Sequence, residues 1–237
     1  PGEAEFRGRI VHPQFWPDDL DYEGKRVVVI GSGATAVTLV PAMAEQAAHV
    51  TMLQRSPTYI VARPSRDRIA GWLQRRLPAR LAAGLIRWKN LLLAMFFFNR
   101  ARARPEKVKR AILDLAARDL PPGYDIERHL TPRYDPWDQR MCLIPDGDLF
   151  AGIRTGKIAI LTGAIERFTE AGIRLESGEA LEADIVVTAT GLVVKLLGGI
   201  GLTVDGKAVN PADRLSYKGL MLTGVPNMAV VFGYTNA

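Results

Sequence analysis

The sequence has 237 residues and a mass of 26.0 kDa, with 48% hydrophobic and 24% charged residues. This balance is typical of one or two globular domains and excludes both a disordered chain and a mini-scaffold. A single cysteine, Cys142, cannot form an internal disulfide or a cysteine-rich zinc site. Nothing therefore requires an oxidising compartment, and we expect a cytoplasmic protein. The three histidines lack ligand spacing, so we expect no metal.

The net charge of +6 is concentrated in one stretch of the chain. Residues 63–110 hold fourteen Lys or Arg against Asp67 and Glu106, which gives that stretch a charge of +12 and leaves −6 elsewhere. A basic stretch with aromatic residues is compatible with nucleic acid or with an anionic membrane surface. Because no nucleic-acid motif accompanies the charge, we expect no nucleic-acid partner.

The first 21 residues are rich in aromatic, proline and acidic residues and have little helical periodicity. We expect an extended N-terminal segment. It contains a spaced set of residues: Phe6, Gly8, His12 and the pair Trp16-Pro17.

A strand, a glycine-rich turn, a helix and a second strand follow. Residues 25–30 (KRVVVI) form a short β-branched run typical of a strand buried on both faces of a parallel sheet. A helix is expected from the turn to about Gln46, and residues 49–54 (HVTMLQ) predict the second strand. Together they make a β-turn-α-β unit of about thirty residues.

The turn has the GxGxxA pattern of a dinucleotide-binding loop. Gly31 permits the tight turn, Gly33 lets backbone approach a pyrophosphate, and a small Ala36 lets helix and strand pack closely. The intervening candidate cofactor-binding residues are Ser32, Ala34 and Thr35. A glycine turn with a merely structural role is the alternative.

The end of the second strand bears on which dinucleotide is bound. NAD-binding units usually place Asp or Glu there, whereas this chain has Arg55, 24 positions beyond Gly31, followed by Ser56 and Thr58. A guanidinium favours the 2′-phosphate of NADPH, by about ten- to a hundredfold over NADH. The alternative is a solvated arginine on a loop.

Residues from about Pro64 to Leu120 are helical and basic, with breaks expected at Pro78 and Pro105. The longest uninterrupted apolar run, Leu91 to Phe98, has eight residues, far fewer than the roughly 20 that a membrane span needs, so we expect no span. Two interpretations stay open for this insertion. It is either a helical lid over the site or a peripheral membrane contact through residues 72–100.

Strand patterns return after the insertion. They cover residues 158–161, 164–169 and 172–176, then a Ser177-Gly178 turn, then residues 184–190. This predicts a small antiparallel meander leading back into a buried strand. The expected fold class is α/β, a Rossmann-like doubly wound NADPH-binding domain with a helical insertion and a small antiparallel meander.

Three blocks resemble one family. The N-terminal segment matches FxGxxxHxxxWP, the fingerprint of Baeyer-Villiger monooxygenases within the flavin-containing monooxygenases. Residues 184–191 (DIVVTATG) resemble the ATG motif of such flavoproteins, which implies that Ala189, Thr190 and Gly191 lie close to cofactor. Residues 134–142 (YDPWDQRMC) resemble the segment with the active-site arginine, which makes Arg140 the implied catalytic residue.

The resemblance implies a reaction and two cofactors. NADPH reduces FAD, and one oxygen atom from O2 is inserted into a ketone, or added to a sulfur or nitrogen substrate such as a thioether. The implied role of Arg140 is to place a positive charge beside the flavin. Many relatives have Lys where this chain has Gln139, which weakens the expected grip on the 2′-phosphate. His12 is expected to hold a linker and not to act in chemistry.

The resemblance also implies that the chain is the central fragment of a longer protein. No second glycine loop precedes Phe6, so we expect an incomplete FAD site and an inactive fragment. Phe232 to Asn236 are expected to return toward the flavin domain. The alternative is a non-enzymatic dinucleotide-binding or membrane-associating module.

We therefore expect five parts. They are a linker with the fingerprint (1–21), the first part of the NADPH-binding domain (22–62), the basic helical insertion (63–130), the second part of the NADPH-binding domain (131–191) and a return segment (192–237).

Overall fold

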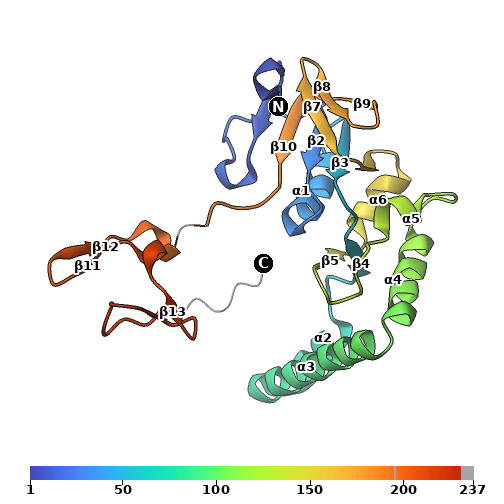
Figure 1. Ribbon diagram of the computed structural model, residues 1–237. Coiled ribbons are helices and arrows are strands. Elements are labelled where there is room, and N and C mark those ends of the chain that lie inside the picture. The colour runs from blue at the N-terminus through green and yellow to red at the C-terminus, as the bar shows by residue number, and fades with distance from the viewer. Residues whose placement is uncertain (195, 231–237) are drawn as a thin grey trace. The chain divides into compact units, whose positions relative to one another are not determined.

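The computed structural model describes residues 1–194 and 196–230, in two compact units, Pro1–Thr190 and Gly191–Ala237 (Figure 1). The expected return segment from Phe232 to Asn236 lies outside the described residues.

The first unit is built on a parallel sheet of five strands. In sheet order they are β1 (Arg9–Val11), β10 (Ile185–Thr188), β2 (Arg26–Ile30), β3 (His49–Gln54) and β6 (Ile158–Thr162). From β2 the chain moves outward through β3 to β6, and β10 then pairs with the other side of β2. The strand order therefore reverses between β2 and β10, and ligands of open α/β sheets bind at the carboxyl ends of strands at such a point.

The sheet is buried on both faces, which explains the continuous apolar strands. On one face, Val27 and Val29 of β2 pack with helices α1 (Ala34–Ala44) and α6 (Asp148–Arg154). On the other face, Val28 packs with a second cluster that includes residues of the small antiparallel sheet. The first unit thus has three layers, which confirms the predicted α/β class.

The small sheet is the expected meander. Its strands are β7 (Ile165–Thr169), β8 (Gly172–Leu175) and β9 (Ala180–Glu182), paired antiparallel in that order. The first of the strands expected in this region, residues 158–161, instead belongs to the parallel sheet as β6.

The N-terminal segment is more ordered than expected. Short 3-10 helices, Glu3–Glu5 and Pro13–Phe15, flank β1, and β1 pairs in parallel with β10. His12 caps the second of these helices, because its Nδ1 accepts a hydrogen bond from the Gln14 amide at 3.2 Å. The segment therefore contributes a strand to the main sheet.

A two-stranded parallel sheet encloses the helical insertion. Strand β4 (Tyr59–Arg63) precedes the helices and β5 (Met141–Pro145) follows them, with Tyr59 opposite Met141. The two ends of a segment of roughly eighty residues therefore lie side by side.

Four helices lie between these strands: α2 (Arg68–Arg76), α3 (Ala79–Ala103), α4 (Pro105–Asp119) and α5 (Ile126–Leu130). Proline ends α2 and α3 where predicted. Pro78 is the N-cap of α3, and Pro105 is at the first position of α4, where its missing N–H costs nothing.

Helix α3 is much longer than the apolar run from Leu91 to Phe98. It runs unbroken for 25 residues, with a mean hydropathy of 1.4 over its most apolar window and 6% of that window buried. Among helices of the described residues, it alone has the length and composition to cross a membrane. That this segment does not span a membrane stays a prediction from the sequence.

The second unit consists of short elements. Two hairpins pair β11 (Leu202–Val204) with β12 (Lys207–Val209), and β13 (Ser216–Tyr217) with β14 (Met221–Leu222).

Candidate functional site

The glycine-rich turn lies at the carboxyl end of β2, where the strand order reverses. Gly31 has φ +136°, and a Cβ placed on it would lie 2.4 Å from the carbonyl oxygen of Ala189, which follows β10. The Gly31 amide donates to the Leu53 carbonyl at 2.8 Å, which ties the turn to β3. Glycine is therefore required here by both backbone angle and space.

The N-terminus of α1 follows directly. Gly33 is its N-cap, and no side chain caps the helix. The first-turn amides of a helix have no intrahelical acceptors and favour an anion. Ala36 is fully buried, so the helix packs closely on the sheet, while Ala34 and Thr35 are exposed. This end of α1 can bind a phosphate group.

Ser32 joins this turn to two other segments. Its side chain is buried, and its Oγ donates to the Ser56 carbonyl at 3.4 Å. The Ser32 carbonyl accepts from the Cys142 Sγ at 3.7 Å. Burial raises the pKa of the Cys142 thiol, so that it stays protonated and chemically inert near neutral pH.

The parallel pairing of β4 with β5 positions the segment that carries Arg140. Because Tyr59 lies opposite Met141, the preceding residues Thr58 and Arg140 are neighbours. The Arg140 carbonyl accepts from the Tyr134 hydroxyl at 2.9 Å and from the Thr58 hydroxyl at 3.3 Å. The backbone of Arg140 is therefore held from two sides.

A second tyrosine supports this arrangement. The Tyr59 hydroxyl donates to the Tyr134 carbonyl at 2.7 Å, and the two rings meet edge to face at 5.5 Å. Burial raises the pKa of Tyr59 to about 12, so the hydroxyl remains a donor. Sequence reasoning missed the roles of Thr58, Tyr59 and Tyr134; the only signal was that all three lie beside residues already selected.

The side chain of Arg140 lies near the glycine-rich turn. Its Nη1 would be 3.9 Å from a Cβ placed on Gly33. Arg140 and Gln139 are both exposed. The positive charge of Arg140 and the uncapped end of α1 therefore lie close together, which favours a ligand with several negative charges.

The other predicted residues fall into two groups. Arg55 and Ser56 are exposed directly after β3, and the Ser32–Ser56 hydrogen bond ties their segment to the glycine-rich turn. Ala189 contacts that turn, whereas Thr190 ends the first unit and Gly191 begins the second. The structure brings together the turn, Ser56, Ala189 and Arg140.

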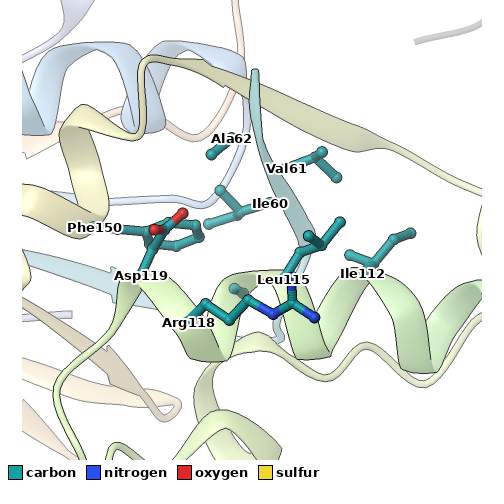
Figure 2. Close-up of a pocket in the computed structure, with 9 residues that line it drawn as sticks. Ile60, Val61, Ala62, Ile112, Leu115, Arg118, Asp119 and Phe150 are labelled. Carbon is teal, nitrogen blue, oxygen red and sulfur yellow. The ribbon is translucent and has the colours of Figure 1, made fainter. Parts of the chain in front are cut away.

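The described residues also contain a hollow of about 170 Å³ between α4 and β4. Figure 2 shows its lining, which is mostly apolar, with Arg118 and Asp119 among the side chains drawn around it. The hollow shares no residue with the glycine-rich turn or with Arg140, so we do not assign it to the candidate site.

Comparison with known proteins gives consistent results. Residues 1–82 match the family described as "Flavin-binding monooxygenase-like". The whole chain is 55% identical to the FAD-containing monooxygenase EthA of Mycobacterium tuberculosis and 48% identical to the probable FAD-binding monooxygenase AlmA of Acinetobacter baylyi, covering 48% of each. The chain thus spans about half the length of these relatives.

Solved structures support the fold. A steroid monooxygenase bound to NADP aligns over 80% of this chain and 43% of its own length, with a TM-score of 0.62 and 22% identity. An open form of cyclohexanone monooxygenase aligns over 93% of this chain and 51% of its own length, with a TM-score of 0.62 and 19% identity. By sequence, the chain is similar to flavin-containing monooxygenases, over residues 1–82 to the family as a whole and over its full length to EthA.

Proposed function

We propose that the chain is the NADPH-binding portion of a cytoplasmic, FAD-dependent monooxygenase of the Baeyer-Villiger type. Its substrate is a small ketone or thioether-like molecule, and O2 supplies the oxygen atom. The observation that carries this proposal is the placement of the Arg140 guanidinium beside Gly33, at the uncapped N-terminus of α1.

The residues present fit a dinucleotide. The space at Gly33 admits a pyrophosphate, because a Cβ there would meet only the tip of the Arg140 side chain. First-turn amides of α1 donate to its oxygens. Arg55, exposed at the end of β3, pairs with the 2′-phosphate, and Ser56 and Gln139 add neutral hydrogen bonds.

EthA is an FAD-containing monooxygenase, and AlmA is a probable FAD-binding monooxygenase. When bound, FAD supplies the oxygen chemistry, and the protein supplies position and charge. In this chain, Ala189 and Thr190 follow β10 at the reversal of strand order, where their backbone borders the cofactor space. Gly191 is assigned to the same backbone segment.

Arg140 stabilises negative charge as it develops during oxygen transfer. A guanidinium remains charged at any working pH, and the hydrogen bonds from Thr58 and Tyr134 fix the backbone that carries it.

The test of cofactor choice is the substitution Arg55→Ala. We expect the ratio of NADPH to NADH affinity, measured by isothermal titration calorimetry, to fall about ten- to a hundredfold, since the charge-assisted bond to the 2′-phosphate is lost. Arg75→Ala, an equally exposed arginine on α2, serves as the control and should leave the ratio unchanged. An unchanged ratio in Arg55→Ala would refute the 2′-phosphate assignment.

The test of catalysis is Arg140→Ala in the protein at its full cellular length. We expect ketone-dependent NADPH oxidation to fall about a hundred- to a thousandfold, the loss seen when one fixed donor is removed from a transition state. Arg140→Lys keeps the charge and should recover part of the rate. If Arg140→Ala turns over like the unaltered protein, Arg140 has no part in the reaction.

A further inference from the structure

Helix α3 carries a row of large apolar side chains that the rest of the described chain leaves uncovered. The row, here called the apolar stripe, is Leu81, Leu85, Trp88, Leu92 and Met95. Intervals of four and three residues place these side chains on one face of a helix. Each of the five is more than half exposed.

Cations border the apolar stripe on both sides. Arg80 and Arg87, seven residues apart, lie along one edge, and Lys89 and Arg100, eleven apart, lie along the other, as the 3.6-residue turn requires. No charged residue falls within the apolar stripe itself. Long basic side chains at such borders can extend their charged groups to a polar surface while their aliphatic parts cover apolar surface of the helix.

The residues around the apolar stripe carry only positive charges. Residues 68–103, which span α2 and α3, contain eight Lys or Arg and no Asp or Glu. Helix α2 adds two exposed apolar side chains, Ile69 and Trp72. A basic helix with Trp, Phe and Leu among its exposed side chains suits an anionic lipid surface.

The helix is suited to lie on a bilayer and not to cross it. Arg87 and Lys89 are near its middle, and a charge at the centre of a membrane is strongly disfavoured. Lys89 also forms an ion pair with Asp67, the N-cap of α2, which ties the middle of α3 to its neighbour. Figure 1 shows α2 and α3 together, with α3 reaching beyond the strands of the first unit.

We infer that the apolar stripe of α3 binds the surface of an anionic lipid bilayer, with the helix axis parallel to that surface. The apolar side chains enter the boundary between headgroups and acyl chains, and the exposed cations Arg80, Arg87 and Arg100 meet lipid phosphates. This inference is independent of the proposed cofactor chemistry, because none of these residues belongs to the glycine-rich turn or its neighbours.

The test is co-sedimentation of the protein, at its full cellular length, with vesicles of phosphatidylcholine alone or mixed with phosphatidylglycerol. We expect tighter binding to the mixed vesicles and weaker binding as salt rises. The paired substitution Leu85→Gln with Trp88→Gln should lower the affinity for mixed vesicles at least tenfold. Arg80→Gln with Arg87→Gln should lower it roughly thirtyfold, since each cation near such a surface contributes about a fivefold change.

A matched control separates surface binding from a general effect of polarity. Leu115→Gln on α4 alters a side chain that is 52% exposed, close to the 51% of Leu85, and should leave vesicle binding unchanged. The free energy of urea unfolding should be unaltered in all these variants, which shows that the fold is intact. A loss of vesicle binding with retained stability supports the inference, whatever becomes of the proposed cofactor binding and enzyme activity.

Three results would overturn the inference. The first is a protein that fails to bind mixed vesicles at low salt, because the rest of its chain then covers the apolar stripe. The second is binding that Leu85→Gln with Trp88→Gln leaves intact. The third is a stable dimer, measured by light scattering, that the same pair of substitutions converts to a monomer, because the stripe would then serve a second copy of the protein.

Discussion

At the scale of single residues, the two glycines of the glycine-rich turn are required for different physical reasons. Gly31 has a positive φ and touches the Ala189 carbonyl, so its lack of a side chain serves the fold. Gly33 has an ordinary backbone angle and open space around it, so the structure alone does not require glycine there. Its absent side chain therefore points to a ligand.

This difference gives a paired prediction. Gly31→Ala should lower the free energy of unfolding by about 1–3 kcal/mol, the cost of a strained backbone residue, and the nearby carbonyl adds to that cost. Gly33→Ala should unfold like the unaltered protein yet bind NADPH at least tenfold more weakly, since its methyl group occupies the pyrophosphate space. Urea unfolding and calorimetric titration measure the two effects; equal stability losses in both variants would contradict the assignment.

The glycine-rich turn was predictable because it depends only on residues that are close together in the sequence. One strand, one turn and one helix define it, and the structure places β2 and α1 within a few residues of the predicted bounds. The site roles of Thr58 and Tyr134 were not predictable in this way. Thr58 contacts Arg140 from 82 residues away in the chain, through the pairing of β4 with β5. Tyr134 contacts it from 6 residues away, within a loop before β5.

At the scale of elements, a buried polar cluster fastens α5 to the sheet. The Gln54 amide on β3 donates to the His129 carbonyl at 2.7 Å and to the Thr162 hydroxyl at 3.0 Å. The His129 Nδ1 lies 2.9 Å from the same hydroxyl. A neutral imidazole can accept the Thr162 proton there, and burial lowers the pKa of His129.

The lowered pKa predicts how stability depends on pH. Above about pH 6.5 the histidine is neutral in both the folded and the unfolded chain, so its full contribution to the free energy of unfolding is present. As pH falls from the ordinary histidine pKa toward the lower pKa of the folded state, the unfolded chain binds its proton first and the protein loses stability. Urea unfolding between about pH 7 and pH 5 should show this loss, and His129→Gln should reduce it. An identical pH dependence in both proteins would contradict the role given to His129.

At the scale of the whole molecule, strand pairing was the hardest feature to foresee. The sequence led us to expect an extended linker over residues 1–21, yet its middle forms β1 beside β10. Three residues are too few for a periodic pattern, and β1 gains stability only from a partner more than 170 residues later in the chain. The meander and the proline-bounded helices were predictable, since turn and helix-end signals are short in range.

The order of strands also links the fold to the proposed function. Because β2 lies between β3 and β10, the turn after β2, the arginine after β3 and the backbone after β10 all end at the same edge of the sheet. The helical insertion returns Arg140 to that edge through the β4–β5 pair. One surface thus gathers the contacts that a dinucleotide needs, although they come from four separate segments of the chain.

The most direct test of this account is a crystal structure of the protein with NADP⁺. We predict pyrophosphate oxygens within hydrogen-bonding distance of the Ala34 and Thr35 amides, the Arg140 guanidinium beside them, and the 2′-phosphate paired with Arg55. A nucleotide bound elsewhere, or a 2′-phosphate that lies away from Arg55 in solvent, would contradict it.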